Sequence, residues 1–332
     1  MAATTDDAAI AVSVVVPACG RMDLLDRNLD ALMRQQFDPV QYEIIVVDDE
    51  PNHNTLHLVA GWRTRTLERG PRLSYVANPG PSGPGAARNR GWQAARAPVV
   101  AFTGDDAVPE PNWLTEGLAA LGDGLDVACG RIQTPVPSRP TDHQRSARGH
   151  EAADFTSANC FFRKKVLERL DGFDERFDVP RGCDADMHFR LLEHGIALGR
   201  APRALVVYPV RPVPWGASLL QIRHAVSDAL LYKKHPALYR QKVEPRPRWD
   251  YYAIVGALLV ALAGQLLGLP FLTWLALAVW FVLTARLCVH RLRGAARTPS
   301  HVLEMIVTSA LLPPLSVFWR LAGALRYRVR FA

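Results

Sequence analysis

Two acidic residues follow an apolar run in the N-terminal half of the chain. Asp105 and Asp106 come shortly after the β-branched and aromatic run 99–103. Carboxylate oxygens are the ligands that Mg²⁺ prefers, and one or two of them commonly hold the ion together with substrate phosphates. The pair therefore predicts a divalent-metal site at the end of a strand. Taken alone, it also fits a turn or an N-cap before a helix over 112–121.

A second acidic pair, Asp48 and Asp49, ends the preceding strand-like run 42–47. Carboxylates in this position of α/β folds can accept hydrogen bonds from a base or a ribose, although a solvated loop also explains them. The glycine- and proline-rich stretch 81–91 allows backbone N–H groups to approach phosphates, and Arg88 within it could add positive charge. The stretch is neither a Walker A loop nor a G-x-G-x-x-G motif, so alone it is a weak signal.

A third acidic group opens the helix expected over 184–194. Asp184 and Asp186 lie two residues apart in the stretch Cys-Asp-Ala-Asp. A carboxylate beside a sugar-nucleotide site could remove the proton from an acceptor hydroxyl. Asp184 alone also fits an N-cap, where its charge would favour the helix dipole.

Short apolar runs alternate with helix-like stretches through the first 210 residues. Strands are expected over 11–16, 42–47, 73–77, 99–103 and within 155–162, and helices over 21–35, 54–68, 112–121, 164–170 and 184–194, with one more ending near 97. This alternation predicts an α/β fold with a mainly parallel sheet flanked by helices. Ligands bind beyond the carboxyl ends of such strands, where the acidic residues stand. Residues 133–153 are polar and are expected to form a loop.

The charge is unevenly distributed along the chain. The 332 residues include 39 Lys or Arg and 32 Asp or Glu, a net charge of +7. Residues 1–210 have a net charge of −5 and residues 211–332 a net charge of +12, which suggests a soluble domain tied to an anionic surface. The five cysteines are scattered and form no zinc or disulfide pattern. The first ten residues lack the basic region of a signal peptide, so the N-terminal domain is expected in the cytoplasm.

The C-terminal third of the chain is expected to enter a membrane. Residues 251–285 contain no charge, and a single helix of that length would be about 52 Å long against a bilayer core of about 30 Å. Gly268 and Pro270 divide the stretch, which predicts a hairpin with both ends cytoplasmic because basic residues flank both sides. A buried helical pair of a soluble protein is the alternative.

Two further segments complete the expected organisation. Residues 211–250 are expected to form an amphipathic helix, over 217–234, and a basic linker to the membrane region 251–332. The apolar segment 302–319 is interrupted by Pro313-Pro314 and followed by arginines. A re-entrant or interfacial segment would keep that basic tail in the cytoplasm.

Taken together and in order, these segments resemble family 2 glycosyltransferases of the GT-A fold. The resemblance covers about residues 11–210 and is carried by six segments, over 12–21, 44–50, 84–91, 99–114, 159–177 and 183–195. It implies that Asp49 contacts the nucleobase with Pro17 and Ala18 nearby, that Asp105 lies near the ribose, that Asp106 binds the metal, and that Asp184 is the base with Asp186 and Arg190 in support. Gly104, Cys183 and Tyr208 stand where many members have an acid, a Glu and a His.

The resemblance implies an inverting glycosyltransferase that uses Mg²⁺ or Mn²⁺, and the apolar C-terminal region implies that a membrane anchors it. The expected donor is a nucleotide diphosphate sugar, the expected acceptor is lipid-linked or a cell-envelope glycan, membrane lipid is a further partner, and no nucleic acid is expected. The enzyme would work on the cytoplasmic face of the inner membrane. The absence of a Gln-x-x-Arg-Trp stretch argues against a processive synthase. The alternatives are a polyprenyl-phosphate sugar transferase and a non-catalytic sugar-nucleotide sensor or assembly partner, the latter supported only by the three departures.

Overall fold

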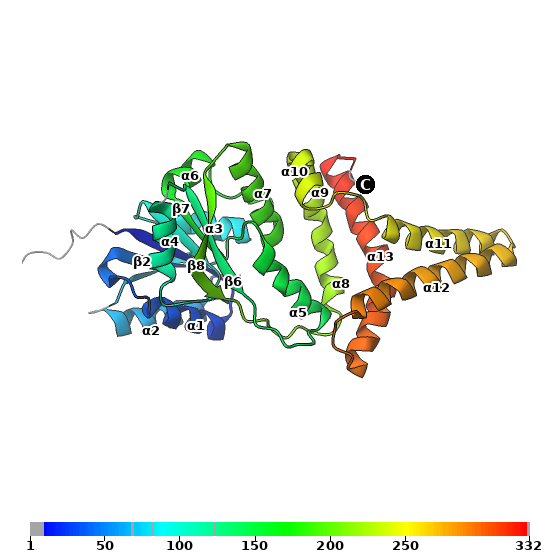
Figure 1. Ribbon diagram of the computed structural model, residues 1–332, viewed down its shortest axis with the longest axis horizontal. Coiled ribbons are helices and arrows are strands. Elements are labelled where there is room, and N and C mark those ends of the chain that lie inside the picture. The colour runs from blue at the N-terminus through cyan, green and yellow to red at the C-terminus, as the bar shows by residue number, and fades with distance from the viewer. Residues whose placement is uncertain (1–9, 68–69, 81–82, 123, 331–332) are drawn as a thin grey trace, which may run out of the picture. The chain divides into compact units, whose positions relative to one another are not determined.

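The computed structural model divides the chain into two compact units (Figure 1). The first comprises residues 1–135 and 148–209, and the second comprises 136–147 and 210–332. The segment 136–147, which the sequence places in the domain over 1–210, thus belongs with the C-terminal helices. The described residues exclude 1–9, 68–69, 81–82, 123 and 331–332. The expected absence of a signal peptide and part of the loop 81–91 therefore fall outside the described residues.

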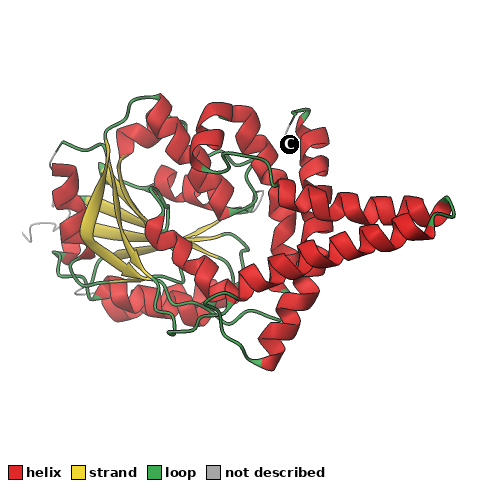
Figure 2. Ribbon diagram, turned by 45° about the vertical axis from the view of Figure 1, so that its right-hand side comes forward, coloured by secondary structure: helices red, strands yellow, loops and turns green. Residues whose placement is uncertain are grey.

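The first unit is built on one mixed sheet of eight strands (Figure 2). The strands are β1 (Val12–Ala18), β2 (Tyr42–Asp48), β3 (Arg72–Ala77), β4 (Val99–Thr103), β5 (Val108–Pro109), β6 (Val127–Gln133), β7 (Asn159–Arg163) and β8 (Leu198–Val207). Their order is β3-β2-β1-β4-β7-β6-β8-β5. The pairs β3–β2, β2–β1, β1–β4 and β6–β8 are parallel, and β4–β7, β7–β6 and β8–β5 are antiparallel. The expected α/β fold is confirmed, with antiparallel strands in the second half of the sheet.

Helices cover the sheet and pack closely on it. They are α1 (Met22–Met33), α2 (His53–Thr66), α3 (Pro84–Ala94), α4 (Trp113–Gly122), α6 (Lys164–Arg169) and α7 (Pro180–Glu193), with the short 3-10 helices η1 (Pro39–Gln41) and η2 (Arg148–Ala152). Helix α1 buries Leu25, Leu29 and Leu32 completely, as its helical spacing predicts. Helix α3 approaches β1 so closely that a Cβ at Gly91 would lie 2.2 Å from Val15. Only glycine allows this packing, which fixes α3 against the sheet.

One edge of the sheet collects the loops that follow the parallel strands. Ala18 at the end of β1 pairs with Asp48 at the end of β2, and β4 runs parallel to β1 and ends at Thr103. Strand β7 is antiparallel to β4, with Asn159 opposite Thr103. The turns after β1, β2 and β4 and the loop before β7 therefore meet at this edge, which is called the carboxyl edge below.

Helix α7 begins a turn earlier than the sequence predicts. It starts at Pro180, with Val179 in the N-cap position. Proline suits the first helical position because its φ is already helical and the N–H that it lacks would be unpaired there. Asp184 thus lies inside the helix, in its second turn, and the N-cap interpretation of Asp184 is wrong.

The second unit is helical throughout its regular elements. It contains α5 (Asp142–Ala147), α8 (Ala217–Gln221), η3 (Ile222–His224), α9 (Ala225–Lys234), α10 (Pro236–Lys242), α11 (Trp249–Leu266), α12 (Pro270–Leu292) and α13 (Pro299–Tyr327). Helices α11, α12 and α13 are long and apolar enough to cross a membrane. Helices α11 and α12 lie side by side as a hairpin, with Gly268 at φ +66° in the turn and Pro270 at the start of α12 (Figures 1 and 2).

Helix α13 runs without interruption through Pro313 and Pro314, so the expected break there is wrong. Each proline removes one backbone hydrogen bond, but long helices tolerate this where neighbouring helices pack around the site. Pro313 is buried, and one turn earlier Ser309 accepts a hydrogen bond from Arg291 at 3.3 Å. Packing and side-chain hydrogen bonds therefore support the helix where its backbone ladder is incomplete.

Helix α13 crosses the open end of the α11–α12 hairpin (Figures 1 and 2). Near the end of α12, Arg291 donates to Thr308 Oγ1 at 2.7 Å. Just before α11, Glu244 accepts a hydrogen bond from Arg320 at 3.1 Å. Positions far apart along α13 thus meet the same end of the hairpin, so α13 lies across that end instead of following the hairpin along its length.

Candidate functional site

Asp105 and Asp106 lie in the turn after β4 and are 1% and 7% exposed. Arg21, in the turn after β1, donates from Nε to Asp105 Oδ2 at 3.0 Å and from Nη1 to Asp106 Oδ2 at 3.1 Å, and its Nη2 contacts Asp105 Oδ1. The Tyr208 hydroxyl, just after β8, donates to Asp106 Oδ2 at 2.9 Å. Helix α4 begins only at Trp113, so neither acid is its N-cap. The pair instead forms a buried charge cluster at the carboxyl edge.

The charge state of Asp105 is set by two opposing effects. Burial raises the pKa of Asp105 to about 6, and the positive charge of Arg21 opposes this rise without cancelling it. A further positive charge beside the carboxylate would favour its ionised form. The cluster is therefore suited to receiving a cation.

The donor set of the cluster fits a hard divalent cation that is shared with a substrate. Among the described residues no group of three or more His, Cys, Asp or Glu side chains could hold a metal. Two carboxylates suit Mg²⁺ or Mn²⁺ when substrate phosphates and water supply the remaining oxygens. At Gly104, where family members often have an acid, a Cβ would lie 2.8 Å from Asp106 Oδ1. A side chain at position 104 would therefore require the Asp106 carboxylate to shift, and the acidic residues that the turn offers a metal are Asp105 and Asp106.

Asp48 and Asp49 have different roles although they are neighbours. Asp48 is buried and accepts a hydrogen bond from the Tyr75 hydroxyl at 3.0 Å. Asp49 is half-buried; its Oδ1 accepts from Asn78 Nδ2 and its Oδ2 from the Gly83 backbone N–H, both at 2.8 Å. Asp48 thus holds two strands together, whereas Asp49 fixes the loop that leads into α3.

Pro17 and Ala18 lie beside Asp49, because the Asp49 backbone N–H donates to Ala18 O at 2.9 Å. All three residues are expected to contact the nucleotide. They occupy neighbouring positions at the carboxyl ends of β1 and β2, an arrangement in which α/β folds bind nucleotides. The contact itself remains a prediction.

The arginines of the α3 segment point in different directions. Arg88, the predicted donor-binding residue, is 8% exposed, donates to Pro84 O at 2.7 Å and lies over the Phe173 ring at 5.6 Å. Its Nε is buried without a hydrogen-bond partner. Arg90 is exposed, and its Nη2 lies 3.8 Å from the Cβ position of Gly80, in the loop before α3. Arg90 is thus the arginine of this pair that reaches the loop.

Asp184 is held at the same edge by the loop before β7. It accepts hydrogen bonds from the Ser157 backbone N–H at 3.2 Å and from the Thr156 hydroxyl at 3.4 Å, and the Ser157 hydroxyl donates to its other oxygen. That loop leads into Asn159, which pairs with Thr103 at the end of β4. The register therefore brings the Asp184 carboxylate to the edge where the Asp105–Asp106 turn begins.

Asp186 and Arg190 support α7. Asp186 is fully buried and accepts from Arg190 Nε at 2.8 Å. Arg190 also donates to Leu170 O and Gly172 O, each at 2.8 Å. This buried pair ties α7 to the segment after α6, so it positions the helix that carries Asp184.

Two residues of the Asp105–Asp106 cluster are not among the site residues predicted from the sequence. Arg21 is not named there, and Tyr208 is named only as a position where the family pattern has a His. A lone arginine after a strand forms no recognisable motif. The one usable signal is its position: the turn after β1 must meet the turn after β4 once both strands are parallel neighbours.

Comparisons with known proteins agree with this geometry. The family described as Glycosyl transferase family 2 matches residues 13–180, and the group described as Glycosyl transferase family group 2 matches residues 140–322. Glycosyltransferase AglE of Haloferax volcanii is 25% identical over 211 residues, which are 60% of this chain and 67% of that protein. Validoxylamine A glucosyltransferase of Streptomyces hygroscopicus subsp. limoneus is 34% identical over 226 residues, which are 56% of this chain and 49% of that protein. The chain thus spans about half the length of the Streptomyces relative.

A solved structure shares the fold. The mannosyltransferase PcManGT from Pyrobaculum calidifontis, in complex with GDP-Man and Mn²⁺, superposes with a TM-score of 0.54 at 19% sequence identity. The match covers 95% of this chain and 86% of that chain.

Proposed function

The chain belongs to glycosyl transferase family 2, and from this premise we propose that it is a membrane-anchored, inverting glycosyltransferase. It would move a sugar from a nucleotide diphosphate sugar to a lipid-linked or cell-envelope acceptor. The observation that carries the proposal is the meeting of three acidic groups at the carboxyl edge: Asp49, the Asp105–Asp106 cluster and Asp184. Asp49 and the Asp105–Asp106 cluster follow the paired strands β2 and β4, and Asp184 is held by the loop before β7.

The donor would bind along the ends of β1, β2 and β4. Asp49 would contact the nucleobase, with Pro17 and Ala18 beside it, and Asp105 would lie near the ribose. Arg88 would stabilise the donor side from within α3. The Pyrobaculum mannosyltransferase holds a nucleotide sugar, GDP-Man, in its complex, which supports a donor of this class.

Asp106 would hold a divalent cation together with the donor diphosphate, with Asp105 beside it. The Mn²⁺ in the Pyrobaculum complex and the hard-oxygen donor set support Mg²⁺ or Mn²⁺. A bound cation would supply Lewis-acid stabilisation to the departing diphosphate. Arg21 pairs with both carboxylates and balances part of their charge.

Asp184 would act as the general base. Its carboxylate would accept the proton of the acceptor hydroxyl while the hydroxyl oxygen bonds to the anomeric carbon and the bond to the diphosphate breaks. Attack opposite the leaving group inverts the anomeric configuration. Three hydrogen bonds from Thr156 and Ser157 would hold the carboxylate in place for this step.

The helical unit would anchor the enzyme on the cytoplasmic face of the inner membrane. Helices α11 and α12 are apolar over most of their surface, and basic residues stand before α11 and after α12. By the positive-inside rule both ends of this hairpin would be cytoplasmic. Helix α13, which lies across the open end, would lie in the interface, and its basic tail would then remain in the cytoplasm.

The proposal is tested with purified full-length protein, a panel of nucleotide sugars and a lipid extract as acceptor. We expect transfer from one nucleotide sugar, stimulated by Mn²⁺ or Mg²⁺, with a product whose anomeric configuration by NMR is opposite to that of the donor. A retained configuration would exclude direct displacement. Transfer to a lipid phosphate that survives Asp184→Asn would favour the polyprenyl-phosphate alternative, because a phosphate acceptor needs less help from a base. Donor binding without any turnover would favour a sensor.

A further inference from the structure

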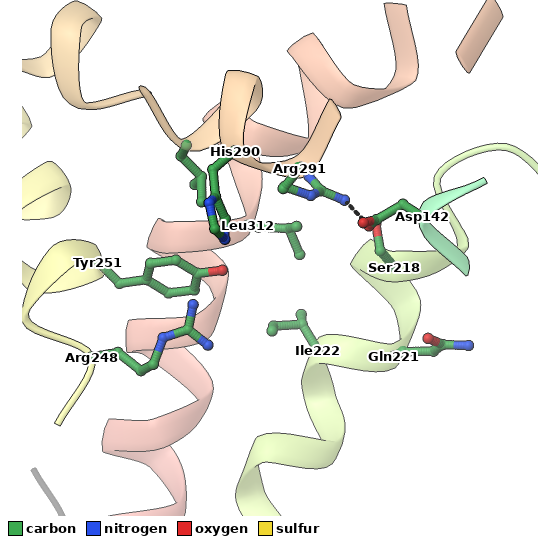
Figure 3. A pocket seen from close by; sticks show the side chains of 10 residues that line it. Asp142, Ser218, Gln221, Ile222, Arg248, Tyr251, His290, Arg291 and Leu312 are labelled. Atoms are coloured by element: carbon green, nitrogen blue, oxygen red, sulfur yellow. Dashed lines mark hydrogen bonds and ion pairs between the residues drawn. The ribbon is translucent and has the colours of Figure 1, made fainter. Parts of the chain in front are cut away.

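The helical unit contains a cavity at the open end of the α11–α12 hairpin (Figure 3). Its volume is about 320 Å³, at the lower end of the range for sites that bind small organic molecules. The start of α11, the end of α12, α5, α8, η3 and α13 all contribute residues to its walls. Every lining residue belongs to the helical unit. It is called the hairpin cavity below.

One cation of the hairpin cavity is already neutralised. Arg291 is 8% exposed and donates from Nη2 to Asp142 Oδ2 at 2.8 Å, the pair marked in Figure 3, and from Nη1 to Thr308 Oγ1 at 2.7 Å. Arg145 also donates to Asp142, at 2.8 Å. Asp142, the acidic residue of the lining, is therefore balanced by two arginines and has a structural role.

Arg248 and His290 are the other basic residues on the wall, and both can serve a ligand. The Arg248 guanidinium lies over the Tyr251 ring at 4.2 Å, and its ion pair with Asp250 is long, at 3.6 Å. Both side chains of that pair are about half exposed, at 45% and 55%, so the pair contributes little. Within the described part of the chain, the His290 ring forms no hydrogen bond or ion pair. Figure 3 shows Arg248, Tyr251 and His290 gathered on the same side of the cavity.

The rest of the lining is largely apolar. Ile222, Leu287 and Leu312 contribute hydrocarbon surface, and Ile222 faces Arg248 and Tyr251 across the cavity in Figure 3. A free inorganic anion would gain nothing from this surface. A ligand with a charged oxygen group and a hydrocarbon chain would use both kinds of wall, since arginine pairs well with phosphate and apolar contacts favour the chain.

If the α11–α12 hairpin spans a bilayer, the hairpin cavity at its open end lies at the depth of the lipid phosphates. Beyond it, the hairpin exposes large apolar side chains, including Leu262, Phe271 and Phe281. When such a hairpin lies in a bilayer, its basic open end stands at the level of the headgroups. The phosphates of membrane lipids occupy the same level, so a lipid can present its phosphate to the hairpin cavity without leaving the membrane.

We propose that the hairpin cavity binds the phosphate group of a long-chain lipid and that this lipid carries the sugar acceptor. Arg248 and His290 would contact the phosphate, and Ile222, Leu287 and Leu312 would contact the first carbons of the chain. The claim that this lipid carries the sugar acceptor rests on the proposed function, whereas the claim that the cavity binds a lipid phosphate does not.

The test measures binding of dodecyl phosphate, a simple long-chain phosphate monoester, to the full chain in detergent by calorimetry. We expect saturable binding at one site, and binding of inorganic phosphate at least about tenfold weaker because it misses the apolar walls. Arg248→Gln and His290→Gln should each weaken binding of dodecyl phosphate between about tenfold and a hundredfold. Phosphatidylglycerol in nanodiscs, tested as competitor, separates a bulk-lipid headgroup from a phosphate monoester.

Two arginines provide matched controls. Arg246 and Arg286 are exposed, stand on the same segments as Arg248 and His290, and do not line the cavity. Arg246→Gln and Arg286→Gln should leave binding within about twofold of the unchanged protein, because their charges act only at a distance. Equal weakening by all four substitutions, or equal affinity for inorganic phosphate, would overturn the proposal. Displacement by phosphatidylglycerol at equal concentration would show that the site takes bulk lipid and would overturn the acceptor assignment.

Transfer kinetics separate this proposal from the proposed function. With a lipid-linked acceptor, Arg248→Gln should raise the KM for the acceptor and leave nucleotide-sugar binding unchanged. An unchanged acceptor KM would refute the acceptor role of the cavity while the glycosyltransferase assignment stands. If no lipid-linked acceptor is used and dodecyl phosphate still binds with the expected pattern of variants, the lipid acceptor is wrong and the binding site stands.

Discussion

The carboxyl edge of the sheet and the hairpin cavity both collect charged residues from distant parts of the chain, but by different means. At the sheet edge, parallel pairing aligns the ends of β1, β2 and β4, so acidic pairs that follow strands must meet. In the hairpin cavity, Arg248 and His290 meet only because a turn at Gly268 brings the two helix ends together. Strand-end sites can therefore be predicted from sequence, whereas sites between helix ends depend on turns and packing.

The two regions also differ in charge. At the sheet edge, two buried carboxylates face one arginine, so the cluster has an excess of negative charge and can accept a cation. The lining of the hairpin cavity contains one carboxylate, Asp142, and two guanidinium groups, Arg248 and Arg291, so the balance is positive. The first region would act on a phosphate through a shared cation, and the second would contact a phosphate directly.

The largest effect is expected in α7, where substitutions should separate the catalytic role of Asp184 from the structural role of Asp186. Asp184→Asn keeps the size and hydrogen-bonding capacity of the side chain but cannot accept the proton, so transfer should fall about 10²–10⁴-fold while donor binding persists. Asp186→Asn should instead remove the negative charge that balances the largely buried Arg190 guanidinium and destabilise the protein by about 3–5 kcal/mol. Turnover assays and thermal unfolding measure the two effects. Near-normal turnover by Asp184→Asn would assign the base to another residue.

The next prediction distinguishes the roles of Asp105 and Asp106 in metal-dependent donor binding. Asp106→Ala should abolish metal-dependent donor binding, because Asp106 is the proposed metal ligand, whereas Asp105→Ala should retain part of it. Calorimetric titration of the nucleotide sugar with and without Mn²⁺ measures both. The assignment of Asp106 fails if Asp106→Ala binds the donor with unchanged dependence on Mn²⁺.

Arg21 should compete with the cation for the carboxylates. Arg21→Gln removes the charge that contacts both acids, so Mn²⁺ should bind about tenfold more tightly without donor, as expected for one lost like-charge contact near a partly buried site. The exposed Arg27, on α1, gives the control Arg27→Gln. Weaker or unchanged Mn²⁺ binding in Arg21→Gln would show that Arg21 does not share the metal position.

The topology of the helical unit can be tested in whole cells. With the native thiols removed, Leu269→Cys should react with an impermeant reagent from outside, because it lies in the hairpin turn. Arg297→Cys and Arg330→Cys should not react, since the open end and the tail are predicted to be cytoplasmic; Arg297 is exposed, so a lack of labelling there reports topology and not burial. Labelling at position 330 but not at 297 would mean that α13 crosses the membrane.

The smallest effect concerns the packing of the hairpin cavity. Asp142→Asn weakens two charge-assisted hydrogen bonds and should lower stability at neutral pH by about 1.5–3 kcal/mol. Burial opposes but does not outweigh the hydrogen bonds and charges of Arg291 and Arg145, which hold the pKa of Asp142 below its usual value. A lowered pKa contributes stability above the unfolded-state pKa and loses it as pH falls through the folded pKa. Unfolding curves of wild type and Asp142→Asn should therefore converge in acid.

The strands beside the acidic groups could be predicted because their runs are apolar and β-branched. The strands β6 and β8 could not, since Gly130 and Arg131 interrupt one and Arg200 and Arg203 the other. These arginines are exposed and stand among buried residues of the same strand. The strands can be recognised only from their pairing with neighbouring strands. The polar stretch 133–153, expected as a loop, contains α5 because that helix packs against other parts of the helical unit.

Proline and glycine residues, which usually interrupt helices, explain the other differences between the expected and the observed elements. Pro180 and Gly182 suggest a loop, yet they form the first turn of α7. Pro313 and Pro314 suggest a break, yet α13 continues because neighbouring groups support it. Local propensity is overridden where a helix end or a packed neighbour supplies the missing hydrogen bonds. Arg21 escaped prediction for another reason: its partners stand more than eighty positions later in the chain.

The path of the chain through the segment 136–147 has a consequence for protein engineering. Arg145 donates to Arg293 O at 2.6 Å and Ala296 donates to Pro140 O at 2.9 Å, so this segment is part of the helical unit although it is encoded within the catalytic unit. A single cut after residue 209 would therefore leave α5 without its packing partners. A chimera that exchanges the helical unit between relatives has to move both segments together, and a version reduced to the first unit needs a short bridge in place of 136–147.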